Sequence, residues 1–176
     1  MEHIKSKIRT IPHFPKQGVM FRDITTLLKD AQGLKDVIKE FYERYKNEKI
    51  DLVAGIESRG FILGGALAHA LGKGFVPLRK PGKLPGEKER VEYTTEYSTD
   101  AIEIHKDAIK AGDNVLLIDD LIATGGSSIA AAQLIEKLGG KIVECALIVE
   151  LPELHGREKL ESKGYKVFSL VSFEGE

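Results

Sequence analysis

The sequence has little cysteine and no long apolar run. Its single cysteine, Cys145, excludes a disulfide within the chain and any metal centre built on several cysteines. Cys145 stands in an apolar, strand-like stretch, so we interpret it as a small buried residue rather than a nucleophile. No apolar run approaches the roughly 18 residues that a membrane-spanning helix needs, and the first 15 residues lack the apolar core of a signal peptide. We therefore expect a cytoplasmic protein without a membrane partner.

An excess of charge of either sign is also missing. The 26 lysine and arginine residues balance 27 aspartate and glutamate residues, which leaves a formal net charge of −1. This balance gives no overall attraction to nucleic acid or to an anionic membrane, so any anion site must be local. The 176 residues are 42% hydrophobic and 30% charged, which is typical of a soluble globular chain. The length predicts one domain, 1–176, with a full hydrophobic core.

Short apolar runs alternate with helical patterns along the chain. The runs that indicate strands buried on both faces are residues 52–56, 75–79, 114–119, 142–151 and 165–173. The patterns typical of helices cover residues 34–45, 59–71, 127–139 and 155–162. This alternation predicts an α/β fold with a central, mainly parallel sheet and helices on both faces.

Two segments do not follow this alternation. Residues 11–25 are rich in turn-forming residues and precede the first core strand. Residues 80–100 hold two prolines, two glycines, many charges and few apolar side chains. A long polar insertion in a compact α/β domain is usually functional or disordered. We interpret residues 80–100 as a lid formed by a flexible hairpin; the simpler alternative is a solvated loop.

The stretch LLIDDLIATGGSS, residues 116–128, joins two carboxylates to a glycine-rich turn. Ligands of parallel α/β sheets bind beyond the carboxyl ends of the strands, and residues 119–128 are expected at such an end. The glycines allow close backbone approach, and a helix beginning near Ser127 or Ser128 offers unpaired N–H groups. The residues predicted to form this phosphate cradle are Ala123, Thr124, Gly125, Gly126, Ser127 and Ser128.

The acidic pair needs a different ligand group from the cradle. Carboxylates do not bind phosphate, but they accept hydrogen bonds from vicinal hydroxyls. Asp119 and Asp120 can hold the 2′- and 3′-hydroxyls of a ribose whose 5′-phosphate occupies the cradle, and can stabilise positive charge on the sugar ring. The simpler alternative is an ordinary strand–loop–helix turn with Ser127 as the N-cap. A Walker loop is excluded, because no lysine follows the glycines.

The motif at residues 116–128 resembles the phosphoribosyl pyrophosphate motif of the type I phosphoribosyltransferase family. Residues 14–25, 57–61, 77–86, 92–98 and 149–160 resemble the family members that act on adenine, in the same order and over nearly the whole chain. The resemblance implies the type I fold with a small N-terminal hood at about 11–25 and a lid at about 80–100. It also implies Mg²⁺-dependent conversion of adenine and phosphoribosyl pyrophosphate to AMP and pyrophosphate in purine salvage, usually by a homodimer.

Carried over residue by residue, the resemblance implies a base site and a lid. The backbones of Met20 and Arg22 would hydrogen-bond the adenine edge, and Phe21 would stack on the ring. Glu96 and Tyr97 would lie on the lid that closes over the sugar. Glu96 would help a proton leave the purine as a general acid or base, with a backbone group as the alternative.

The resemblance also implies the groups that surround the diphosphate. Ser58 and Arg59 would supply donors around a strained or cis peptide, and positive charge would come from Arg79, Lys80 and Lys83. With Glu96, the candidate catalytic residues are Arg59 and Asp119. The chemistry would be direct displacement at C1′ through an oxocarbenium-like transition state, without a covalent nucleophile. Mg²⁺ would be held mainly by the diphosphate and the ribose hydroxyls rather than by a protein cage.

Two positions depart from the family pattern. Gln17 stands where the hood commonly has proline, and Ser127 stands where threonine is frequent in the cradle.

Three rival functions accompany this interpretation. The nearest rival is a related transferase for a 6-oxopurine or a pyrimidine. A nucleic-acid-binding regulator would need a basic face or an added domain, and a synthetase of the ribose diphosphate would need more length and ATP-binding features.

Overall fold

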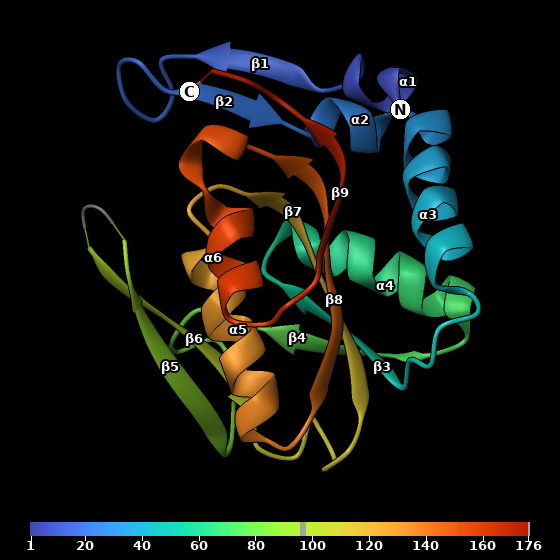
Figure 1. Cartoon of the computed structure of the whole chain (residues 1–176), viewed down its shortest axis with the longest axis vertical. Coiled ribbons are helices and arrows are strands. Elements are labelled where there is room, and N and C mark those ends of the chain that lie inside the picture. The colour runs from blue at the N-terminus through green and yellow to red at the C-terminus, as the bar shows by residue number, and fades with distance from the viewer. Residues whose placement is uncertain (96–97, 176) are drawn as a thin grey trace.

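The computed structural model describes residues 1–95 and 98–175, with a five-stranded parallel sheet at the centre (Figure 1). The strand order is β4–β3–β7–β8–β9. The strands are β3 (Leu52–Ile56), β4 (Gly74–Leu78), β7 (Asn114–Ile122), β8 (Lys141–Glu150) and β9 (Val167–Ser172), and every neighbouring pair is parallel. The predicted α/β fold is therefore confirmed.

Helices cover both faces of the sheet because each strand sends alternate apolar side chains to opposite sides. Leu116 and Ile118 pack in one core cluster with α3 (Ala31–Tyr45) and α4 (Arg59–Leu71). The neighbouring side chains of β7 pack in the second cluster with α5 (Gly126–Lys137), and α6 (Gly156–Ser162) contributes Leu160 to it. Cys145 belongs to the second cluster, where burial raises the pKa of its thiol to about 12, as expected for a structural cysteine.

The N-terminal segment forms a small ribbon beyond one edge of these layers (Figure 1). It begins with α1 (Glu2–Lys5), and β1 (Arg9–Pro12) then pairs antiparallel with β2 (Met20–Asp23). The short helix α2 (Thr25–Lys29) leads into α3. Among the described residues, no helix combines the length and apolar character required to cross a membrane.

The polar insertion forms an antiparallel hairpin of β5 (Lys88–Thr94) and β6 (Thr99–His105). The pairing continues to His105, beyond the predicted boundary at 100, because the apolar β6 side chains Ile102 and Ile104 are buried in the core cluster that includes α5. The hairpin is confirmed over the described residues, while its role as a lid stays a prediction.

The end of β7 and the start of α5 differ from the predicted boundaries. We predicted that the strand ends at Asp119, but β7 continues to Ile122 because residues up to Ile122 remain paired with β8. The helix begins at Gly126 with Gly125 as its N-cap, so the predicted start near Ser127 is confirmed to within one residue, whereas the alternative of a Ser127 N-cap is wrong. Gly125 has φ of 84°, a left-handed conformation that glycine adopts without the steric cost of a side chain.

Candidate active site

A cavity of about 400 Å³ lies at the carboxyl ends of the parallel strands. It is bounded by the ends of β3 and β7, the residue after β8, the β1–β2 ribbon and the β5–β6 hairpin. The predicted site residues that line it are Met20, Phe21, Arg22, Arg59, Lys80, Asp119, Asp120, Ala123, Thr124, Gly125, Gly126 and Ser127. Segments more than a hundred residues apart in the sequence therefore share one cavity.

Some predicted site residues do not line this cavity. Ser58 stands between two lining residues, and the Glu57–Ser58 peptide is cis, one of the two conformations that the resemblance implied. The Arg79 guanidinium bonds the Glu57 carboxylate at 3.3 Å and lies outside the lining, as does Lys83. Ser128 is buried in α5 and is not part of the lining either. Glu96 and Tyr97 lie outside the described residues.

The glycines of the cradle occupy positions where a side chain has no room. A Cβ on Gly125 would lie 3.0 Å from the carbonyl oxygen of Gly156, and one on Gly126 would lie 3.1 Å from the Tyr93 ring. The turn is thus packed between the start of α6 and the β5–β6 hairpin. The first N–H groups of an α-helix have no partners within the helix, so the start of α5 at this turn is compatible with the predicted anion site, which stays a prediction.

The two carboxylates are nearly buried at the end of β7. Asp119 is 9% exposed and Asp120 is 8% exposed. The Oδ1 atom of Asp119 accepts the backbone N–H of Asp120 at 2.8 Å. Desolvation raises the pKa of Asp119 well above its ordinary value, and the neighbouring charge of Asp120 raises it further. Holding Asp119 ionised in this place therefore costs the fold free energy.

Arg59, the first residue of α4, pairs with the second of these carboxylates. Its Nε donates a hydrogen bond to Oδ2 of Asp120. Desolvation lowers the pKa of Arg59, but the hydrogen bond and charge of Asp120 outweigh that effect, so its pKa is raised. A guanidinium that remains protonated at the cavity wall is suited to bind an anionic group.

Part of the cavity lining is apolar. Val19, Phe21, Ile56 and Leu151 contribute to it, and the Phe21 ring meets Phe14 edge-on with centroids 5.2 Å apart. Within the described chain β2 pairs only with β1, so its other edge has backbone groups available for a ligand.

The Arg22 side chain is bound to neighbouring protein groups. Nη1 donates to Oγ1 of Thr10 at 2.7 Å, and Nη2 donates to the carbonyl of Gly175 at 2.9 Å. These bonds direct the guanidinium to the C-terminal tail. The arrangement agrees with the expected backbone role of Arg22, because the side chain is engaged elsewhere.

Several lining residues were not predicted. Ile56 is the last residue of β3, and Leu151 directly follows β8. Ligands of parallel sheets bind beyond the carboxyl ends of the strands, so this rule could have predicted both residues. Tyr93 and Thr95 approach the cavity because the hairpin packs against α5. Both belong to the segment 80–100 that we interpreted as a lid, but neither was predicted individually, because the packing that brings them to the cavity is tertiary.

The comparisons with known proteins agree with this geometry. The family model described as a phosphoribosyl transferase domain matches residues 23–175, and the chain belongs to that family. Within it, the chain is similar to proteins named adenine phosphoribosyltransferase. The one from Nitrosospira multiformis is 60% identical over 172 residues, and the one from Methylobacillus flagellatus is 61% identical over 172 residues. Both alignments cover 98% of this chain and 98% of the relative.

Solved structures give the same result at the level of the fold. The adenine phosphoribosyltransferase from Thermoanaerobacter pseudethanolicus is 49% identical, with a TM-score of 0.94 over 98% of this chain and 99% of that one. The Saccharomyces cerevisiae enzyme, complexed with D-2,5-dideoxy-2,5-imino-altritol 1,6-bisphosphate and adenine, is 42% identical, with a TM-score of 0.91 over 97% of each chain.

Proposed function

We propose that this chain is an adenine phosphoribosyltransferase, a glycosyltransferase of purine salvage that converts adenine and 5-phosphoribosyl 1-pyrophosphate to AMP and pyrophosphate. The observation that carries the proposal is one cavity whose lining combines apolar side chains, among them Phe21 and Leu151 (the base slot), with the acidic pair and the glycine cradle. The slot suits a planar base, the pair suits ribose hydroxyls and the cradle suits a phosphate. The relatives' names specify the base as adenine.

The proposed reaction is a direct displacement at C1′ of the ribose. A bond forms between a ring nitrogen of adenine and C1′, the bond from C1′ to the pyrophosphate oxygen breaks, and the adenine N–H proton is lost. Asp119 and Asp120 would hold the hydroxyls and stabilise positive charge on the ring. Arg59 and Lys80 would bind the leaving pyrophosphate. The proton would pass to Glu96 or to a backbone group.

Within this proposal the hood, residues 11–25, orients the base, and the lid, residues 80–100, covers the sugar. The free edge of β2 supports the first role, because backbone carbonyls there can accept the adenine amino group. The position of Tyr93 and Thr95 on the cavity wall supports the second. Exclusion of water would favour transfer to the base over hydrolysis.

Mg²⁺ is the proposed cofactor. The described residues contain no group of three or more His, Cys, Asp or Glu side chains that could hold a metal ion, while the cavity does contain an adjacent carboxylate pair. Two carboxylates are too few to enclose a metal ion on their own, but they fit a hydrated Mg²⁺ that is ligated mainly by the diphosphate and the ribose hydroxyls. When bound, the ion would neutralise charge on the leaving group. The role of Asp119 and Asp120 would be to orient the hydroxyls.

A homodimer is the proposed assembly, and the cytoplasm is the proposed location. Ile62, in the first turn of α4, is 52% exposed and is the most exposed of the large apolar side chains among the described residues. Pairing of two α4 helices would bury it. An Ile62→Glu substitution is expected to shift the sedimentation coefficient to that of a monomer.

The proposed location follows from the charges of the reactants. The substrates and the nucleotide product that carry phosphate groups do not cross membranes freely, which supports an intracellular reaction.

The test is pyrophosphate release from phosphoribosyl pyrophosphate and Mg²⁺ with adenine, guanine, hypoxanthine and orotate offered in parallel. Turnover with adenine alone is expected. Turnover with another base would contradict the base assignment and keep the cradle assignment. Binding of the sugar diphosphate without turnover on any base would contradict the enzymatic proposal and favour a regulator.

A further inference from the structure

The segment between β8 and α6, residues 151–156, contacts the cavity at both of its ends. Leu151 lines the apolar slot, and its backbone N–H donates to the Ile122 carbonyl at 3.0 Å. Gly156 is buried directly against the cradle. A Cβ at that position would collide with the Ala123 carbonyl oxygen and would lie 3.0 Å from the Gly125 nitrogen. The position of this segment therefore determines the shape of the base slot and of the phosphate turn.

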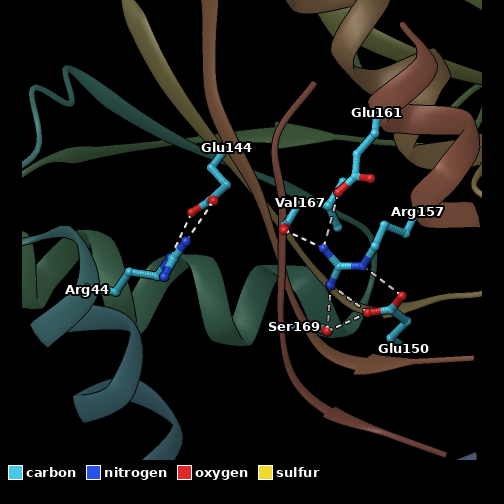
Figure 2. A network of polar contacts seen from close by, with 7 residues as sticks. All are labelled: Arg44, Glu144, Glu150, Arg157, Glu161, Val167 and Ser169. Carbon is cyan, nitrogen blue, oxygen red and sulfur yellow. Dashed lines mark hydrogen bonds and ion pairs between the residues drawn. The ribbon is translucent and has the colours of Figure 1, made fainter. Parts of the chain in front are cut away.

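An ion pair joins the residues that flank this segment (Figure 2). Arg157 donates from Nε to Oε1 of Glu150 at 2.8 Å and from Nη2 to Oε2 at 2.6 Å. The same guanidinium donates to the Val167 carbonyl at 2.7 Å and to Oγ of Ser169 at 3.0 Å. Ser169 in turn donates to Glu150 at 2.6 Å. One guanidinium thus fixes the start of α6 to the end of β8 and to β9.

We propose that the Glu150–Arg157 pair positions the base slot and the phosphate cradle together, a role that depends on the proposed function. Neither side chain lines the cavity, so Arg157 would act as a positioning residue through Gly156, and Glu150 through Leu151. Loss of the pair releases the start of α6 from the sheet. The cradle then loses its support, and a displacement of about 1 Å at a reacting centre can reduce the rate about 100-fold.

The same strand offers a matched control near its amino end. Arg44 of α3 forms a bidentate pair with Glu144, with both bonds at 2.8 Å (Figure 2). Glu144 and Glu150 both belong to β8, and both carboxylates are nearly buried. The Arg44–Glu144 pair does not contact the cavity. Loss of either pair is expected to destabilise the fold, but only loss of the Glu150–Arg157 pair is expected to alter ligand binding.

The experiment compares Arg157→Met with Arg44→Met in the full chain. Both variants are expected to lower Tm by several degrees. Arg157→Met is expected to raise KM for phosphoribosyl pyrophosphate at least about tenfold, equivalent to roughly 1.4 kcal/mol of lost binding. It should also reduce the rise in Tm that this ligand produces. Arg44→Met is expected to keep both KM values within about twofold of the wild type.

The alternative to positioning is a purely structural ion pair. One result would support this alternative and overturn the proposal. Both variants would show a similar fall in Tm, and both would keep the KM values and the ligand-induced rise in Tm of the wild type. If Arg157→Met fails to fold, Glu150→Gln removes the charge while retaining an acceptor, and the same readings apply. The rise in Tm requires no base, so this test remains valid if turnover with adenine fails.

Discussion

The guanidinium of Arg22 donates a hydrogen bond to the main-chain carbonyl of Gly175, 2.9 Å away, across 153 residues of sequence. The same side chain lies over the Phe173 ring, with its central carbon 4.7 Å from the ring centroid. The strand β2, which borders the cavity, is therefore held by the C-terminal tail. The tail itself donates from the Gly175 nitrogen to Glu153 at 3.1 Å, within the segment that begins with Leu151.

Removing the Arg22 side chain should affect the base more than the sugar diphosphate. Arg22→Met is expected to raise KM for adenine about tenfold, equivalent to about 1.4 kcal/mol, because the β2 edge loses its anchor. KM for phosphoribosyl pyrophosphate should stay within twofold and serves as the internal control. Steady-state kinetics with each substrate varied in turn would check this. Equal rises in both KM values would contradict a role confined to the base slot.

A methyl group at Gly156 should disturb the cradle without removing any polar group. Gly156→Ala would place a Cβ against the backbone of Ala123 and Gly125, which cannot move aside as a side-chain tip can. We expect a loss of about 1–3 kcal/mol in stability and a higher KM for phosphoribosyl pyrophosphate. Chemical denaturation and kinetics would measure both. Gly65→Ala has no heavy atom within 4 Å of the new Cβ in this chain and is the control: it should leave KM unchanged and raise stability by about 0.5–1 kcal/mol, as alanine does in a helix interior.

Tyr45 offers a prediction for stability alone. Its hydroxyl donates to the Glu144 carboxylate at 2.7 Å in a buried contact, and desolvation with this bond raises the pKa of Tyr45. Tyr45→Phe should cost about 1.5 kcal/mol, the low end of the usual range of about 1.5–3 kcal/mol for a hydrogen bond to a charged group, because Glu144 keeps Arg44 as a partner. Unfolding in urea would show the loss. Altered kinetics in this variant would mean that the amino end of β8 influences the cavity after all.

The sequence predicted those parts of the fold that local patterns determine. Residues 52–56 and 59–71 were predicted with the bounds that β3 and α4 have, because an apolar run and a helical pattern meet there at a polar turn. The end of β7 was predicted too early. Charged residues normally end a buried strand, but here the ladder with β8 continues past both carboxylates. Only the paired strand could have supplied that information.

In the candidate site, too, the predictable residues are those that a local sequence pattern determines. The cradle was predictable because its residues are consecutive and each has a physical reason to be there. Leu151 follows β8 directly and could have been inferred from the strand order, whereas Tyr93 reaches the cavity only through packing of the hairpin against α5. The Glu150–Arg157 pair had no signal in the sequence, because acidic and basic residues seven positions apart are common on solvated surfaces.

Asp119 should show opposite effects on activity and stability. Its pKa is raised in the folded chain, so its contribution to stability is full below its ordinary pKa of 3.8 and is lost as the pH rises through the raised value. Asp119→Asn keeps an acceptor for the Asp120 N–H but removes the buried charge. The variant should therefore be more stable than the wild type at pH 7.5, by about 1 kcal/mol or roughly 2–4 °C in Tm. This advantage should shrink toward pH 4.

Catalysis in the same variant should fall by about 100-fold or more in kcat/KM, because an amide cannot stabilise positive charge on the sugar as a carboxylate does. Thermal unfolding between pH 4 and 7.5, together with pyrophosphate release, would measure both effects. The exposed Asp107→Asn substitution controls for the loss of one net charge. An Asp119→Asn protein that is less stable than the wild type across the whole pH range would show that the ionised carboxylate is favourable in the fold. The free energy that an ionised Asp119 costs the empty protein would then not be available for holding the ribose.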